Sequence, residues 1–356
     1  MAAGIDQVLA DVDFSAIHDL SVQFPGEEKS LTIKEAAKRL AQGDSISPDA
    51  MLSQVFKGFA SEVSNLGTLA MSIILPVLLS SLLSQVLSDR DGLSDFSRCV
   101  CFVLVLAPIV LCVLEELEHV KATITKTTDR MERMLPVLLT LLTAVGGSAS
   151  SAFLHPVVVA ASGSMVYLAR EVILRLVMCC CAVTTINHLS ERAHLTRMAQ
   201  LLRSMVCWLL GVSFTVFLGT MSVQGACSAS LDGAAIRAAK YAVDNFVPIV
   251  GGMFSDTMDT LVGCTVIVKN ALGVTAMPVL LGAVAAPMLR TLAVAAVLKL
   301  CAALLEPVAS ADTVKAIGDF SGTVVLFLIT MMCVSTMYFL LIVQTMLMGN
   351  LTVMLR

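Results

Sequence analysis

The sequence has few charged residues for its length. Only 14% of its 356 residues are Asp, Glu, Lys or Arg, whereas soluble globular proteins usually carry about 25%. Hydrophobic residues make up 57% of the chain. So few charged side chains cannot cover the surface of a soluble protein of this size, and lipid must cover much of it. The composition therefore predicts a membrane protein.

The sequence also lacks the short motifs with which enzymes hold phosphates, metals or acyl groups. It contains no GxxxxGK[ST], HExxH, GxSxG or GxGxxG, no CxxC pair and no basic tract typical of nucleic-acid binding. Its eleven cysteines lie mostly in or beside apolar runs, which is typical of small buried hydrophobic residues. We therefore expect no enzymatic activity, no cofactor and no metal. Active transport would take its energy from a partner.

The first 66 residues differ from the rest of the chain. They carry ten acidic and five basic side chains. The segments IDQVLADV and LTIKEAAKRLAQ read as short amphipathic helices, and residues 51–66 repeat apolar side chains at intervals of three and four. We therefore predict an acidic, extramembrane region of amphipathic helices over residues 1–66. Its last helix lies on the membrane surface or packs against the remainder of this region.

Long apolar runs fill residues 67–356. A bilayer core of roughly 30 Å needs about 20 apolar helical residues. Residues 134–187 are too long for one helix and are interrupted at GGSASSAFLHP and at Arg170-Glu171, so they form three crossings, or one crossing and a re-entrant hairpin. The predicted fold is an all-α polytopic transmembrane helical bundle of seven to nine spans with a small helical N-terminal region. The expected spans are 68–87, 98–114, 134–150, 154–169, 171–187, 204–222, 260–287, 290–307 and 322–346.

Basic residues in short loops predict the orientation of these spans. Residues 188–203 contain Arg192, Arg197 and Arg203, so this loop is expected to be cytoplasmic. The span count then places 223–259 and 308–321 outside, together with the N-terminal region, and the C-terminus inside. It also places 115–133 outside as a loop, despite the four basic side chains of that segment.

Four charged residues lie inside apolar runs: Lys269, Arg170, Glu171 and Arg175. A charge at the centre of a bilayer costs about 2.5–3.5 kcal/mol on insertion scales, so it normally faces protein or water. These residues form an intramembrane polar seam or a subunit contact. Alternatively, Arg170 and Glu171 mark a break between two short helices, and the charged side chains extend to the membrane interface.

Residues 231–260 combine charge with helix breakers. Residues 231–246 read as a short amphipathic helix that Pro248 and Gly251-Gly252 stop, and Ser255 can cap a second helix. The apolar residues of this segment exceed what a short loop needs to cover itself. We predict an external helix–break–helix that docks partner proteins; docking on the chain's own spans is the alternative. The residues expected to take part are Arg237, Lys240, Tyr241, Asp244, Phe246, Phe254, Asp256 and Asp259.

Several specific runs resemble one known family. The run SVQGACSASLDGAAIRAAKYAVDNFVPIVGGMFSDTMDTLVGCTVIVKNALGV (222–274) is similar to the signature region of stage III sporulation protein AE, as are GGSASSAFLHP (146–156), KLCAALLEP (299–307) and GNLTVML (349–355). The resemblance implies a multi-pass protein of endospore-forming bacteria, made in the mother cell and placed in the membrane around the forespore. It implies no catalytic residues.

The resemblance also implies partners. The family belongs to the stage III sporulation A group, which includes an ATPase. With stage II sporulation protein Q from the forespore, that group is thought to form a secretion-like channel across two membranes. The expected function is therefore an integral component of this channel, in contact with the other A-group proteins, with lipid and, indirectly, with protein Q. A homo-oligomer is a further expected assembly, which the resemblance itself does not imply. The alternatives are a stand-alone permease for a small solute, with Lys269 in its site, and a non-conducting structural platform.

Overall fold

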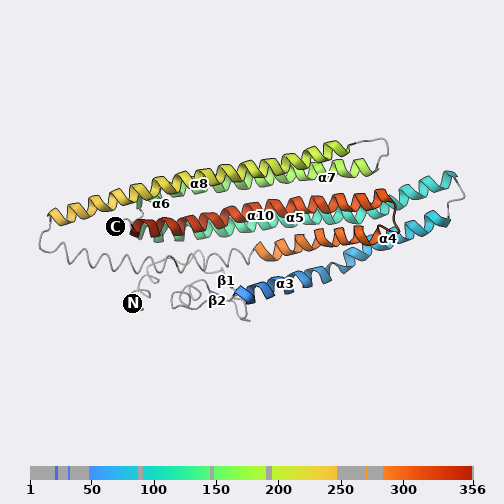
Figure 1. Ribbon diagram of the computed structural model, residues 1–356, viewed down its shortest axis with the longest axis horizontal. Helices are drawn as coiled ribbons and strands as arrows, with labels where there is room; N and C mark the ends of the chain where they lie inside the picture. The colour runs from blue at the N-terminus through green and yellow to red at the C-terminus, as the bar shows by residue number, and fades with distance from the viewer. Residues whose placement is uncertain are drawn as a thin grey trace.

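The computed structural model describes residues 21–22, 31–32, 48–86, 91–144, 148–189, 195–246, 270 and 284–354. The described part is all-α apart from one short ladder, as the sequence predicted, and its long helices lie side by side along the long axis of the molecule (Figure 1). The helices are α3 (Pro48–Asn65), α4 (Gly67–Val86), α5 (Asp91–Ala144), α6 (Ser148–Tyr167), the π-helix η2 (Leu168–Ile173), α7 (Leu174–Leu189), α8 (Thr196–Phe246), an unlabelled helix Val284–Leu305, and α10 (Ala311–Met354).

The N-terminal region contains a two-stranded ladder instead of part of an expected helix. Strand β1 (Ser21–Val22) pairs antiparallel with β2 (Leu31–Thr32), with Val22 opposite Leu31. The prediction of a helix beginning at Leu31 is therefore wrong at its first two residues. β-branched side chains such as Val and Thr favour strands, and Pro25 and Gly26, residue types that favour turns, lie between the two strands in the sequence.

Helix α3 confirms the amphipathic helix expected over residues 51–66. It begins at Pro48, and proline suits the first position of a helix because its missing N–H would have no intrahelical partner there. Val63 and Leu66 pack against the main hydrophobic core, and a Cβ added at Gly58 would lie 3.5 Å from Leu289. The end of α3 therefore packs on the helical bundle. It continues into α4 with a bend of 41°.

Helix α5 is a single helix of 54 residues, about 81 Å long at 1.5 Å per residue. The expected loop over 115–133 is therefore wrong. The physical reason is that residues on one face remain buried throughout this stretch, including Val113, Val120, Ile124 and Met131, while the charged residues lie mostly on the opposite face. No glycine occurs between residues 93 and 145 to interrupt the helix.

The two expected interruptions of residues 134–187 have different outcomes. The break at GGSASSAFLHP is confirmed, because α5 ends at Ala144 and α6 begins at Ser148. The break at Arg170-Glu171 is wrong: η2 continues α6 directly into α7, and Tyr167 and Leu174 on either side both have right-handed helical backbone angles. The sequence marked the position with charge, but the chain accommodates that charge in one wide helical turn.

Helices α8 and α10 are also longer than expected. Helix α8 has 51 residues and includes both the expected span 204–222 and the segment 231–246, so that segment is the end of a long helix rather than a separate one. Helix α10 has 44 residues and includes Asp312 and Asp319, which were expected in a loop. Helix α10 packs against α5, α6, α7 and α8, and its Phe320 and Phe327 are fully buried. It is the central helix of the bundle.

Three helices of the described residues are long and apolar enough to cross a membrane: Thr196–Gly225, Val284–Leu305 and Ala311–Leu347. The bent pair Lys57–Asn65 and Gly67–Leu82 would make a fourth if it is one span. The total of seven to nine spans stays a prediction, since much of residues 260–287 lies outside the described part of the chain.

Candidate functional site

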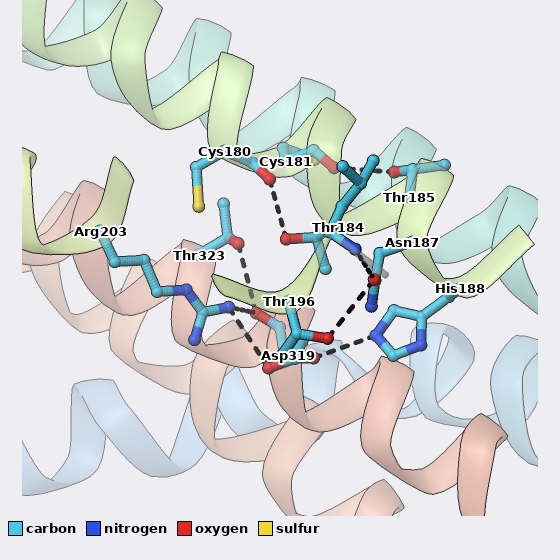
Figure 2. Close-up of polar contacts among 11 residues, drawn as sticks. Cys180, Cys181, Thr184, Thr185, Asn187, His188, Thr196, Arg203, Asp319 and Thr323 are labelled. Atoms are coloured by element: carbon cyan, nitrogen blue, oxygen red, sulfur yellow. Dashed lines mark hydrogen bonds and ion pairs between the residues drawn. The ribbon is translucent and has the colours of Figure 1, made fainter. Parts of the chain in front are cut away.

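A polar cluster joins the end of α7, the start of α8 and the first third of α10. Asp319 of α10 lies between His188 of α7 and Arg203 of α8 (Figure 2). Its Oδ2 is 3.0 Å from His188 Nε2, and its Oδ1 is 3.6 Å from Arg203 Nη2. Arg203 Nη2 also donates a hydrogen bond of 2.6 Å to the carbonyl oxygen of Asp319. One acidic residue thus holds two basic ones from two other helices.

The corner between α7 and α8 brings these basic residues together. Asn187 Oδ1 accepts a hydrogen bond of 2.8 Å from the backbone N–H of Leu195 and one of 3.4 Å from Thr196 Oγ1 (Figure 2). The first N–H groups of a helix have no intrahelical acceptor, so a side chain from the preceding helix stabilises the start of α8. The bond between Asn187 and Leu195 holds the end of α7 close to the start of α8. His188 and Arg203 then approach Asp319 from two sides.

Gly322 makes room for the Arg203 guanidinium. A Cβ added at Gly322 would lie only 3.0 Å from Arg203 Nη1. One turn earlier on α10, a Cβ at Gly318 would meet no atom within 4 Å. The two glycines therefore differ in role: only Gly322 is needed for the close approach of α8 to α10.

These glycines provide a matched pair of variants. Alanine in place of a helical glycine normally stabilises by about 0.5–1 kcal/mol, and we expect Gly318→Ala to raise the free energy of unfolding by this amount. Gly322→Ala should gain less or become destabilising, because the Arg203 guanidinium must move away from Asp319. Thermal unfolding of the detergent-purified protein measures both. An equal gain in the two variants would contradict the packing of Arg203 on Gly322.

The polar cluster corrects the predicted orientation. Residues 188–203 and 308–321 were expected on opposite sides of the membrane, yet His188 and Arg203 both contact Asp319. They lie at the same end of the helices, so the prediction is wrong in this respect. The cause is the number of spans between the two segments: the prediction placed three there, whereas α8 leads away from this end and the helix Val284–Leu305 returns to it, next to the start of α10 (Figure 1). Which side of the membrane holds this end stays a prediction.

A second polar cluster lies between α5 and the helix Val284–Leu305. Glu116 has a side chain that is only 2% exposed, and its Oε1 is 3.3 Å from Arg290 Nε. Thr291, also buried, donates a hydrogen bond of 2.9 Å from its Oγ1 to Glu116 Oε2. A buried carboxylate requires such partners, because removing an unpaired charge from water is costly. This cluster fixes the start of one helix to the middle of another.

Two further hydrogen bonds join long helices. Gln344 Nε2 of α10 donates to the carbonyl oxygen of Met221 in α8 over 2.6 Å, where Gly225 lets the two helices approach. Tyr338 Oη of α10 donates to Thr128 Oγ1 of α5 over 3.0 Å. Polar contacts of this kind hold neighbouring helices together in membranes.

The structure describes three of the four charged residues predicted to form an intramembrane seam. Arg170 and Glu171 lie in η2, and Arg175 follows in α7, where it forms an ion pair with Glu171. Arg175 has a side chain that is 74% exposed. Within the described residues, none of the three pairs with a charged group outside η2 and α7. Lys269 lies outside the described residues, and the seam stays a prediction.

Only the first part of the predicted docking segment lies within the described residues. Arg237, Lys240, Tyr241, Asp244 and Phe246 lie in the last part of α8. Phe254, Asp256 and Asp259 lie outside the described residues, as does the expected break. A contact with partner proteins through this segment therefore stays a prediction, and its first half is the extension of a long helix.

Eight cysteines of the described residues are free, and they differ in burial. Cys112, Cys180, Cys181 and Cys301 are buried, as expected for small hydrophobic residues, while Cys179, Cys207 and Cys227 are exposed. In the part of the chain that the structure describes, no three His, Cys, Asp or Glu side chains are arranged to hold a metal ion. The polar clusters found here join helices and do not form a recognisable catalytic arrangement.

Sequence reasoning did not select the residues that form these clusters. His188 and Asp319 are 131 positions apart, and Glu116 and Thr291 are 175 apart. The available signal was position in the sequence: Glu116 is the second residue after an apolar run, and Arg203 and Asp319 each directly precede a long charge-free stretch. Charged residues at such boundaries can face water or another helix, and the linear pattern does not distinguish the two.

Comparisons with known proteins agree on one family. The family model described as stage III sporulation protein AE matches residues 31–349. A protein of Bacillus subtilis (strain 168) with the same name is 29% identical over 327 residues, which cover 91% of this chain and 82% of that protein. No solved structure matches the chain.

Proposed function

Since the chain belongs to the stage III sporulation protein AE family, we propose that it is an integral membrane component of the mother cell-to-forespore channel, a secretion-like complex required for endospore development. The match over residues 31–349 carries this proposal. The three helices that are long and apolar enough to cross a membrane support an integral position. Family membership itself establishes a role in sporulation.

The proposed location is the mother-cell membrane that surrounds the forespore. The proposed partners are the other stage III sporulation A-group proteins, including their ATPase, and indirectly stage II sporulation protein Q. In this proposal the chain is not an enzyme, and the ATPase supplies the energy. The exposed apolar side chains of α8, among them Trp208 and Val216, suit a helix in contact with lipid.

Two other functions stay open as alternatives. A stand-alone permease would use Lys269 in a solute site, whereas a structural platform would position the other components without conducting. The interhelical polar clusters around Asp319 and Glu116 favour a rigid framework, which suits a channel component as well as a platform. Conductance measurements on the assembled complex in reconstituted vesicles distinguish a channel component from a structural platform.

Removal of the gene tests the proposed role. In a spore-forming host that encodes this chain, deletion is expected to abolish heat-resistant spores and leave vegetative growth unchanged, because the channel serves only the engulfed forespore. Counting spores after heat treatment measures the effect, and a chromosomal copy of the gene serves as the control. Co-purification of the A-group proteins from sporulating cells separates a channel component from a permease. Normal spore counts in the deletion strain would refute the proposal.

A further inference from the structure

One exposed face of α5 is charged over a length close to the thickness of a bilayer core. Residues 115–133 of this helix span about 28 Å at 1.5 Å per residue. The exposed charged residues recur at intervals of three and four along one side, with the gap at 122 occupied by an exposed alanine. We call this surface the charged face of α5. It consists of Glu115, Glu118, Lys126, Asp129, Glu132 and Arg133.

Most of these charges have no partner among the residues that the structure describes. Glu118 pairs with Lys121 of the same helix, with Oε1 and Nζ 3.0 Å apart. No ion pair or side-chain hydrogen bond joins Lys126, Asp129 or Arg133 to any other described residue, and the same holds for Glu132. Among the described residues of a single copy, the charged face is therefore exposed and largely unpaired.

Interhelical contacts show which parts of the other helices lie level with this face. Tyr338 of α10 contacts Thr128, which lies within residues 115–133 of α5. Gln344, less than two turns further along α10, contacts Met221 of α8. Helices α5, α8 and α10 run in the same direction (Figure 1). The charged face therefore lies level with the part of α8 that precedes Met221.

At this level α8 and α10 have the character of membrane spans. The chain has no Asp, Glu, Lys or Arg between Arg203 and Asp232, and none between Asp319 and Arg356. The large exposed side chains here are apolar: Trp208 and Val216 of α8 are 69% and 60% exposed, and Met332 of α10 is 47% exposed. A bilayer that covers these two helices also covers the level of the charged face of α5.

Lipid is an unsuitable neighbour for that face. Charged side chains within a bilayer normally face protein or water, because their transfer into hydrocarbon is costly. We propose that the charged face of α5 is an interface between copies of this chain within the membrane, while the apolar side of α8 contacts lipid. The proposal rests on the membrane position given under the proposed function and does not require a conducting channel.

The distribution of charge favours a second copy as the partner. Residues 115–133 expose or partly expose four acidic side chains (Glu115, Glu118, Asp129 and Glu132) and four basic ones (Lys121, Lys126, Arg130 and Arg133). A partner of one sign would leave half of these charges unpaired, whereas a second copy is complementary in both signs. Copies related by an axis along the membrane normal bring α5 helices together in parallel, and each basic residue then has an acidic one within one turn across the interface.

Photocrosslinking tests which face meets a second copy. Two copies of the full chain with different tags are expressed together, with the photoreactive residue benzoylphenylalanine at position 126 or, as the control, at position 216. Irradiation of intact membranes is expected to link the two tags from position 126 and not from position 216. Links from position 216 alone, or from neither position, would overturn the proposal, and so would labelling of position 126 by water-soluble reagents without any link.

Charge reversal provides a second test that does not depend on one position. An acidic variant carries Lys126→Glu and Arg133→Glu, and a basic variant carries Asp129→Lys and Glu132→Lys. Each variant expressed with itself should lose most of the tag-to-tag link from a photoreactive residue at position 122, because like charges meet. Expressing the acidic and basic variants together should restore it. Failure of the mixed pair to link, or undiminished linking by either variant alone, would contradict the proposal.

The two proposals fail in different ways. If the chain is absent from the membrane fraction, the proposed membrane function is wrong. If the chain is in the membrane fraction and resists protease as the unaltered chain does, but the mixed pair gives no link, only the interface is wrong. Because the mixed pair contains both altered faces, its recovery also shows that each variant folds.

Discussion

Glu116→Ala is expected to lower the free energy of unfolding by about 3 kcal/mol, the lower end of the cost of breaking a buried ion pair, because the Arg290 side chain left behind is 40% exposed. The Glu116 side chain is 2% exposed and lies 3.3 Å from Arg290, so its loss leaves a cavity and an uncompensated guanidinium. It also removes the acceptor of the buried Thr291 hydroxyl. Denaturant unfolding of the detergent-purified protein measures the change.

A double variant and a control show whether this cost comes from the buried pair. Replacing both partners, as Glu116→Met with Arg290→Met, should recover much of the loss, because a buried ion pair can often be exchanged for apolar residues of similar volume. Glu118→Ala, two residues further on, removes an exposed carboxylate paired with Lys121 and should cost at most about 1 kcal/mol. A similar loss in Glu116→Ala and Glu118→Ala would mean that Glu116 is not buried as described.

Asp319→Ala should have the next largest effect, a loss of about 1–3 kcal/mol. The carboxylate is about one-third exposed, but it serves both His188, which is 5% exposed, and Arg203. Without it, His188 of α7 loses its acceptor on α10, and Arg203 of α8 loses its ion pair and keeps only its hydrogen bond to the backbone carbonyl of residue 319. The corner between α7 and α8 should then separate from α10 before the rest of the bundle unfolds, and hydrogen exchange at Leu195 and Thr196 should become faster.

Asp312→Ala is the matched control for Asp319→Ala. Asp312 is exposed in the first turn of the same helix, where an acidic residue contributes only about 0.3–1 kcal/mol through the helix dipole. In Asp312→Ala, the hydrogen-exchange rates of Leu195 and Thr196 should stay unchanged. Equal acceleration in both variants would show that Asp319 acts through α10 as a whole and not through His188 and Arg203.

Much of the fold class was accessible from the sequence, but helix lengths were not. The apolar composition predicted an all-α membrane-type bundle, and the small residues of GGSASSAFLHP correctly marked the end of α5. The charged stretch 115–133 was mistaken for a loop because charge was given more weight than periodicity. Its buried face, with Val120, Ile124 and Met131, follows the helical repeat without interruption.

The candidate site was less accessible than the fold. The residues chosen from the sequence were charges within apolar runs, such as Arg170, Glu171 and Lys269, because a charge in hydrocarbon is conspicuous. The residues that form the interhelical contacts, such as Glu116, Arg203 and Asp319, lie at the ends of apolar runs, where a charged residue is common. Their importance comes from their partners, and a partner more than a hundred positions away leaves no periodic signal.

The sequence by itself determined the kind of protein. The scarcity of charge required lipid or protein to cover the surface, the apolar runs required helices because backbone groups in lipid must be paired within the segment, and the signature runs placed the chain in its family. Only the tertiary structure decided which charges are neutralised within the chain and which are left exposed. Asp319 and Glu116 are paired because other helices reach them, whereas no helix of the described part of the chain pairs with the charged face of α5. The reason is physical: the net cost of a charge depends on the groups within a few ångströms, and helix packing alone sets those groups.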